Sequence, residues 1–151
     1  MPAARPKPRS TTLALRVTLL DPPAGVSWAL QVGRGELVAP TSAAPSRVSL
    51  DFTVEVKEGT GAAPFRLAGP AVQGRPGQRF VYINSGLYAG QPGALAGWRA
   101  KVPLEGITRQ LIDAATTGRP RTLEAQLAGT ARNGAPAHAT VPLLGTGWRV
   151  T

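Results

Sequence analysis

Apolar and polar residues alternate along most of this chain, which is the pattern of β-strands that bury one face. The longest run is SRVSLDFTVEVKE, residues 46–58. Its apolar face consists of Val48, Leu50, Phe52, Val54 and Val56. The opposite face carries charged and hydroxyl groups, so the pattern predicts a strand with a core on one side and water on the other.

Seven further runs have the same period. They are TLALRVTL (12–19), VSWALQV (26–32), RFVYI (79–83), WRAKVPL (98–104), TLEAQLAG (122–129), AHATVPL (137–143) and GWRV (147–150). The segments between them include DPPAG, GTGAAP, NSG, ARNGAP and LLGTG, whose residues favour turns. ARNGAP is a hairpin candidate, because Asn-Gly tolerates the positive φ of the favoured turn.

One segment, GITRQLIDAATTG, has a helical period instead. Its apolar side consists of Ile107, Leu111, Ile112 and Ala115, and Gly118 and Pro120 follow as stop signals. We expect one α-helix over about 105–117. Seven or eight strands with one helix predict a mainly β fold, a single antiparallel β-barrel or sandwich whose helix covers an open end or a face. A chain of 151 residues fits one such domain, over residues 11–151.

The net charge of +9 is concentrated in two places. Residues 1–10 contain Arg5, Lys7 and Arg9 among prolines and alanines, which predicts a disordered basic tail that either keeps the protein soluble or binds nucleic acid. Residues 65–104 contain five basic residues and no acid. This second segment predicts either a surface that receives an anion or basic side chains that protect sheet edges from aggregation.

Alternation places some of these cations together. Arg99 and Lys101 share one face of the strand 98–104, opposite Trp98. Arg79 shares a face with apolar residues of its own strand, where a drier setting strengthens anion binding. The long connection from Asn84 to Gly97 is of a length that is often functional. An anion-receiving surface would comprise Arg66, Arg75, Arg79, Arg99 and Lys101 with Tyr82 and Tyr88.

Catalytic and metal-binding patterns are weak. The chain has no cysteine, and its one histidine, His138, falls on a polar strand face, which favours a surface position. Ser85 lacks the frame of a nucleophile elbow. Asp51 and Glu55 share a strand face with basic residues, which indicates a solvated charge ladder. We expect no metal site and no cofactor, and the glycine-rich stretch GQPGALAG lacks the spacing of a nucleotide-binding loop.

Neither a signal peptide nor a membrane-spanning segment is indicated. The run LALRVTLL is broken by Arg16 and is followed by DPP rather than a cleavage site. No uncharged apolar stretch approaches the length of a membrane-spanning helix. The absence of cysteine suits a reducing compartment, so we expect a soluble cytoplasmic protein.

Several motifs resemble a family of small, uncharacterised bacterial proteins catalogued as a domain of unknown function. They are GPAVQGRPGQRFVYINSG, YAGQPG, WRAKVPLEGI and GTARNGAPAHATVPL. The resemblance runs from about Leu15 to Leu143 and is densest over Gln73–Ile107. The matching positions are Gln73, Gly74, Arg79, Phe80, Tyr82, Ile83, Gly86, Ala89, Gly90, Trp98, Ala100, Lys101, Val102, Pro103, Leu104, Ile107, Ala139, Thr140, Val141 and Pro142. The resemblance implies a single-domain bacterial cytoplasmic protein and no known reaction.

The candidate ligand-binding residues are Arg79, Arg99, Lys101, Tyr82, Tyr88, Gln73 and Arg75. The leading hypothesis is a non-enzymatic binding module that holds an anionic small molecule or a partner's acidic segment between the helix and the 84–97 loop. A nucleic-acid-binding protein is the first alternative. Against it, alternation places five of the eight aromatic residues inward: Trp28, Phe52, Phe80, Tyr82 and Trp98. The second alternative is an enzyme for an anionic substrate, with Tyr82 or Tyr88 as proton donor.

Overall fold

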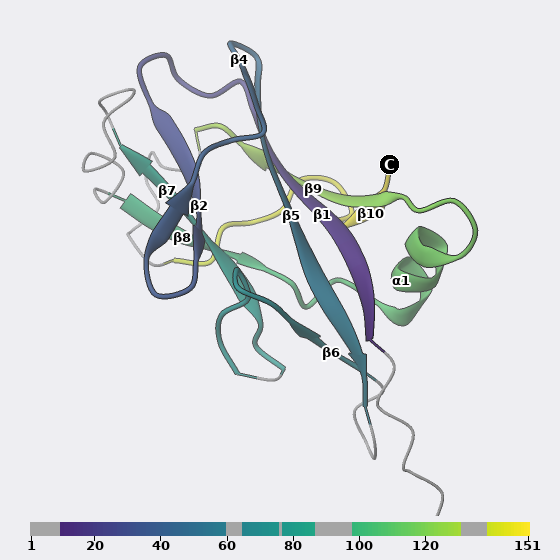
Figure 1. The fold of residues 1–151 in the computed structure, drawn as a ribbon. Helices are drawn as coiled ribbons and strands as arrows, with labels where there is room; N and C mark the ends of the chain where they lie inside the picture. Colours follow the sequence, from purple (N-terminus) through teal and green to yellow (C-terminus); the bar gives the residue numbers. More distant parts are fainter. Residues whose placement is uncertain (1–9, 60–64, 76, 87–97, 131–138) are drawn as a thin grey trace, which may run out of the picture.

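The structure is a computed structural model that describes residues 10–59, 65–75, 77–86, 98–130 and 139–151. In these residues ten strands form two sheets that pack face to face, with one helix beside them (Figure 1). The fold is therefore mainly β, as predicted, and it is a sandwich rather than a closed barrel. Within the described ranges no helix has the length and apolar character to cross a membrane.

The larger sheet has the strand order β10-β9-β1-β5-β4, and β6 pairs with β5 off this path. Its strands are β1 (Ser10–Leu20), β4 (Ser42–Ala44), β5 (Arg47–Glu58), β6 (Phe65–Ala68), β9 (Thr122–Ala128) and β10 (Arg149–Val150). The long pair β1 and β5 is antiparallel from Ser10 opposite Lys57 to Leu20 opposite Arg47. Alternation predicted both strands, although Ser10 lies in β1 and not in the expected tail.

One pair departs from the expected antiparallel arrangement. Strands β1 and β9 are parallel, with Ala14 opposite Thr122 and Leu20 opposite Ala128. A parallel pair needs a crossover connection, and here the whole smaller sheet and the helix separate the two strands in sequence. Alternation fixes which face of a strand is apolar but says nothing about its direction, so the sequence pattern did not indicate this pair.

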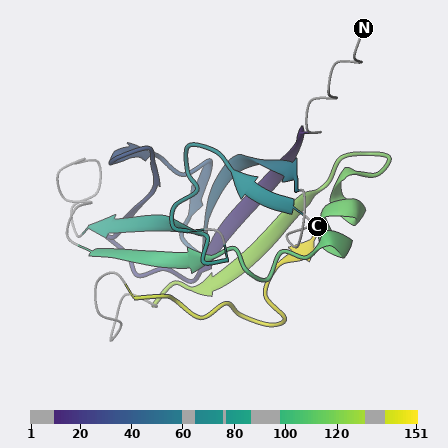
Figure 2. The same cartoon turned by 90° about the horizontal axis from the view of Figure 1, so that it is seen from below.

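The smaller sheet has the order β3-β2-β7-β8. Its strands are β2 (Ser27–Val32), β3 (Glu36–Val38), β7 (Phe80–Gly86) and β8 (Trp98–Pro103). Beyond β8, Thr140 of the predicted run 137–143 forms a parallel bridge with Lys101, and residues 137 and 138 of that run lie outside the described residues. The hairpin candidate ARNGAP and His138 lie outside the described residues. Figure 2 shows β7 and β8 crossing obliquely over β1 and β9.

The core lies between the two sheets. The apolar faces of β1 and β5 supply Leu13, Leu15, Val17, Leu19, Leu50, Val54 and Val56, all nearly inaccessible to solvent. From the smaller sheet, Val81 and Ile83 are 0% exposed and pair with Val102 and Ala100. Because successive residues of a strand point to opposite faces, Phe80 and Tyr82 lie on the outer face, where both are half-buried. The prediction that these two rings face inward is therefore wrong.

The helix α1 spans Arg109–Thr116 and is shorter than the predicted 105–117. Thr108 is its N-cap, with Oγ1 accepting a hydrogen bond from the Leu111 backbone N at 3.2 Å. Ile112 and Ala115 are buried, as the helical period predicted. The helix contacts β1, β9 and β10, so it covers the part of the larger sheet that lies away from β7 and β8 (Figure 1).

Candidate functional site

Two cations lie over two aromatic rings on the outer face of β7 and β8. Arg99 Cζ is 4.9 Å from the centre of the Tyr82 ring, and Lys101 Nζ is 4.8 Å from the centre of the Phe80 ring. The two rings meet edge to face, with centres 4.9 Å apart. We call these four residues the cation–aromatic cluster. Each cationic side chain packs on a ring, and its charged group can stay in contact with solvent. The packing therefore holds the cation in place at a modest cost in free energy.

The strand register explains how the cluster forms. Tyr82 lies opposite Lys101, Phe80 lies opposite Pro103, and Asn84 lies opposite Arg99. Each cation therefore reaches diagonally to the ring two residues before its own partner on β7. Diagonal neighbours of a strand pair are within reach of long side chains. The inner face of the same pair carries Val81, Ile83, Ala100 and Val102, all buried, so the core fixes the strand backbones beneath the cluster.

A groove of about 440 Å³ adjoins the cluster at Phe80 and Lys101. The residues of its lining that bear on ligand binding are Arg75, Arg79, Phe80, Lys101, Glu105 and Thr140. Three cations and one carboxylate give this lining a formal charge of +2, and the neighbouring Arg99 raises the total to +3. The sequence did not single out Phe80 and Glu105 as site residues, because their place in the groove depends on the fold.

Hydrogen bonds hold both the backbone and the side chain of Arg79 in place. Its backbone N donates to Glu105 Oε1 at 2.7 Å, and its carbonyl accepts from the Leu104 N at 2.9 Å. Its Nη1 donates to the carbonyl of Gly74. Its Nε is buried and has no hydrogen-bond partner in the described part of the chain. The guanidinium is thus partly desolvated beside the groove, where a bound anion would find a strong donor.

The turn that carries Arg75 and Arg79 depends on Gly74. Gly74 has a φ of +88°, and a Cβ there would lie 2.3 Å from the carbonyl oxygen of Gln78 and 2.8 Å from the Phe80 ring. Gln73 closes the same turn, since its backbone N and O bond to Phe80 and its Nε2 donates to the Gly33 carbonyl at 2.9 Å. Gln73 is not among the residues that line the groove, and its hydrogen bonds support the turn that carries Arg75 and Arg79.

The other predicted site residues fall into three groups. Arg75 is exposed in the groove lining. Tyr88 lies outside the described residues, as does most of the connection from Asn84 to Gly97. Arg66 does not line the groove: it lies on β6, opposite Lys57 of the larger sheet. The helix does not border the site either, because α1 packs against β1, β9 and β10.

The ion pairs of the described residues lie on the larger sheet and the helix. Arg16 Nε lies 2.7 Å from Asp51 Oδ1, and Arg149 Nη2 lies 3.2 Å from Glu124 Oε1. Hydrogen bonding to Asp51 raises the pKa of Arg16, although burial works against this shift. Arg109 pairs with Glu58, whose hydrogen bonds raise the pKa of that guanidinium. By contrast, neither cation of the cluster has a carboxylate oxygen within 4.0 Å in the described ranges.

The described residues offer few groups that could act in catalysis or bind a metal ion. Asp51 and Glu55, which share a face of β5, pair with Arg16 and Lys57 respectively, which is the arrangement of a charge ladder. Where the chain is described, no group of three or more histidine, aspartate or glutamate residues could hold a metal ion. The cation–aromatic cluster and its groove are the candidate site, because they combine a hollow of about 440 Å³ with cations held over aromatic rings.

Comparison with known proteins identifies the family of the chain but indicates no activity. Residues 13–151 match the model of a family whose description is "Family of unknown function (DUF5990)". This match confirms the resemblance to an uncharacterised domain that the sequence motifs had indicated. No curated protein and no solved structure matches the chain.

Proposed function

The chain belongs to the DUF5990 family, whose function is unknown, and from that premise we propose that it is a non-enzymatic binding module for an anionic small molecule or an acidic segment of a partner protein. The ligand lies on the outer face of β7 and β8 and extends into the groove beside Arg79. We also propose that the protein is bacterial and cytoplasmic and that it needs no cofactor.

One observation carries this proposal: the cluster cations are stacked on aromatic rings instead of being paired with carboxylates. On the larger sheet and the helix, Arg16, Arg109 and Arg149 meet acids. Exposed arginines such as Arg34 and Arg119 have no ion pair among the described residues either, but no aromatic ring holds them in place there. A cation that is positioned but not neutralised attracts anions, and a neighbouring hollow lets several donors converge on one group. Arg75 and Arg79 in the groove add two further donors at one end of the cluster.

A second candidate is single-stranded nucleic acid, and the orientation of β7 favours it. Phe80 and Tyr82 lie half-buried on an outer sheet face beside basic side chains. Proteins that bind single strands combine such aromatic residues with a positively charged surface. The main objection from the sequence, that these rings face the core, no longer holds. The basic segment 1–10 would add phosphate contacts to this binding mode.

The enzyme hypothesis has less support. Tyr82 lies on the face in question and could donate a proton. A general base within reach is harder to find, because Glu105, the acid in the groove, accepts a hydrogen bond from the Arg79 backbone. We therefore place binding before catalysis.

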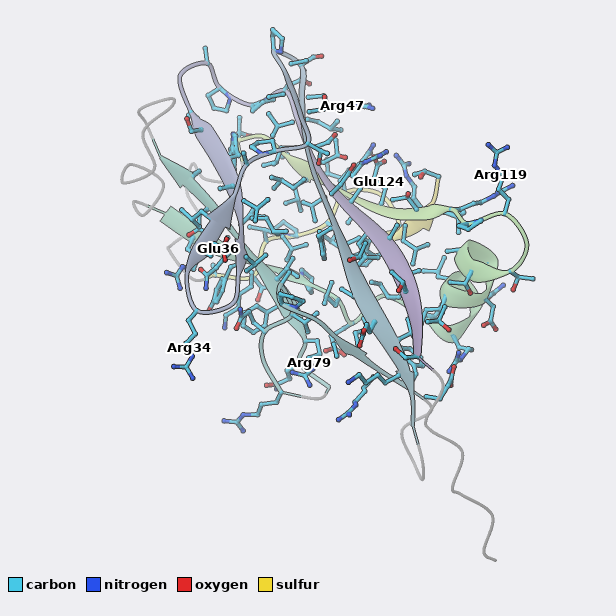
Figure 3. The ribbon with its side chains drawn as sticks, viewed as in Figure 1. Arg34, Glu36, Arg47, Arg79, Arg119 and Glu124 are labelled. Atoms are coloured by element: carbon cyan, nitrogen blue, oxygen red, sulfur yellow. The ribbon has the colours of Figure 1, made fainter. Side chains whose placement is uncertain are left out.

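A thermal-shift screen tests the proposed function. The full chain is heated with citrate, pyrophosphate, a hexaglutamate peptide and a ten-nucleotide single strand, in parallel with Arg99→Ala and with Arg119→Ala as the matched control. Arg119 is exposed, and Figure 3 shows it at the right-hand edge of the molecule, apart from Arg79 near the lower middle. A ligand at about 100 times its Kd should raise Tm by roughly 5 to 10 °C.

The variants and a salt titration then separate the candidates. Loss of the shift in Arg99→Ala but not in Arg119→Ala supports a site at the cluster. A response to the oligonucleotide alone, weakened by salt and by removal of residues 1–9, favours the nucleic-acid alternative. Equal shifts in the parent and in both variants would contradict the proposed site.

A further inference from the structure

Two buried amide side chains on the smaller sheet each have one polar atom without a hydrogen-bond partner among the described residues. Asn84 is 2% exposed and Gln31 is 5% exposed. Asn84 Nδ2 and Gln31 Oε1 have no hydrogen-bond partner in the described structure. Buried polar atoms are nearly always hydrogen-bonded, because an unmade bond costs free energy that water would otherwise have supplied. An unpaired donor and an unpaired acceptor near one another therefore suggest groups that await a ligand.

Both amides lie on the same outer face as the cation–aromatic cluster. Asn84 is two residues after Tyr82 on β7 and lies opposite Ala29 of β2. Gln31 is two residues after Ala29, so it shares that face and is a diagonal neighbour of Asn84. Along β7 the outer face thus presents the groove at Phe80, then the Tyr82 ring with Gln31 beside it on β2, then Asn84. The four steps along the strand from Phe80 to Asn84 cover about 13 Å.

This order of groups matches the parts of a nucleotide. An amide N–H and an amide carbonyl together complement the hydrogen-bonding edge of a nucleobase, which offers an acceptor beside a donor. Tyrosine rings and arginine planes stack on base faces. The cations of the groove suit a phosphate, and the distance along β7 is comparable to the length of a nucleotide from base edge to phosphate.

From this juxtaposition we propose that the anionic ligand is a nucleoside phosphate. Asn84 and Gln31 bind the base edge, the base stacks at Tyr82, and Arg75, Arg79 and Lys101 bind the phosphate. The inference rests on the proposed function, since it names the ligand class of the same face. The nucleotide comes either as a free molecule or as a unit of a single strand, and the two sources share this chemistry.

Arg99 connects the two ends of the site. It lies opposite Asn84 in the register, and its guanidinium lies over the Tyr82 ring. A phosphate that draws the guanidinium toward the groove frees the ring for a base. Side-chain rotation of this kind is fast, so entry needs no movement of the strands.

Isothermal titration of the full chain tests the inference. The probes are UMP, AMP, ribose 5-phosphate and a hexauridylate strand. We expect at least one nucleotide probe to bind ten times more tightly than ribose 5-phosphate, which has the phosphate but no base. In Asn84→Leu and in Gln31→Met this preference should fall below threefold, while the affinity for ribose 5-phosphate stays unchanged.

Two controls keep the result interpretable. Gln110→Met alters an exposed amide on α1 and should keep the preference. Asn84→Leu removes an unpaired buried polar group, so its Tm without ligand should equal or exceed that of the parent. If Asn84→Leu does not fold, Gln31→Met and the comparison of probes on the parent chain still decide the question.

The outcomes separate this inference from the proposed function. Tighter binding of hexauridylate than of UMP, lost in the amide variants, supports the inference with a strand as the source. Equal binding of nucleotides and ribose 5-phosphate overturns it and leaves an anion site intact. Binding of citrate or hexaglutamate, with no response to any of the four probes, also overturns it while the proposed function stands.

Discussion

Arg99 lies opposite Asn84 in the strand register, yet its guanidinium carbon lies over the ring of Tyr82, 4.9 Å from the ring centre. Lys101 makes the same diagonal contact with Phe80. Both cations therefore lean along the strands toward the groove at Arg79, and the charge of the outer face is gathered at that end of β7 and β8. This shared direction is the structural basis of the predictions on binding.

Replacing Arg99 by lysine should weaken binding of the anion although the charge is kept. Lysine lacks the planar group that packs on Tyr82 and donates two parallel hydrogen bonds. We expect a loss of about tenfold in Kd, or about 1.4 kcal/mol. Titration with whichever anion gives a thermal shift measures it, with Arg119→Lys as the matched control. An unchanged Kd would show that charge alone governs binding.

Substituting alanine for Gly74 should destabilise the fold at the groove. The positive φ alone costs about 1 kcal/mol or more, and the Cβ would also meet the Gln78 carbonyl oxygen at 2.3 Å. We expect a loss of about 2 to 4 kcal/mol in the free energy of unfolding, measured by urea denaturation. Gly77→Ala is the control, because Gly77 has a φ of +85° and no atom within 4 Å of its added Cβ. Equal losses in the two variants would mean that the close contact relaxes freely.

Replacing Thr18 by valine should cost more than its place among the polar positions of the alternating run 12–19 would suggest, because Thr18 is fully buried. Thr18 Oγ1 donates to Glu124 Oε2 at 2.9 Å, and Glu124 is only 6% exposed. The variant leaves a buried carboxylate with one donor fewer, so we expect a loss of about 1.5 to 3 kcal/mol in unfolding free energy. Thr12→Val, at an exposed position of the same strand, should change it by less than about 0.5 kcal/mol. Chemical denaturation of both variants gives the comparison.

The Arg16–Asp51 pair should contribute a small coupling that does not change between pH 6 and pH 9. The hydrogen bond to Asp51 raises the folded-state pKa of Arg16 above its ordinary value. Stabilisation from a raised pKa is fully present below the unfolded-state value and is lost only as pH rises through the folded value, far above this range. Both side chains are 35% exposed, so a double-mutant cycle with Arg16→Gln and Asp51→Asn should give about 0.2 to 1 kcal/mol. A coupling that fell between pH 6 and pH 9 would contradict this account.

Much of the fold could be predicted from the chain because period and position are local properties. The alternation in β1 and β5 identified both strands and their buried faces, and the helical spacing of Ile112 and Ala115 identified α1. The site was predicted in part. Arg79 and Lys101 meet at one groove, but Arg66 lies elsewhere and Glu105 was not anticipated. The amides Gln31 and Asn84 gave no sequence signal, because only the fold makes them buried neighbours without partners.

The sequence by itself determined the mainly β class, the single helix and the strands that alternation marks, because backbone geometry imposes those periods on neighbouring residues. Only the tertiary structure decided that Val81 and Ile83 face the core while Phe80 and Tyr82 face outward. In the same way it decided that β9 runs parallel to β1. The alternation of apolar and polar residues does not depend on which face of the strand is buried. It also does not depend on whether the neighbouring strand is parallel or antiparallel. These choices depend on packing between segments far apart in the chain, and that packing brings the cations and the aromatic rings together.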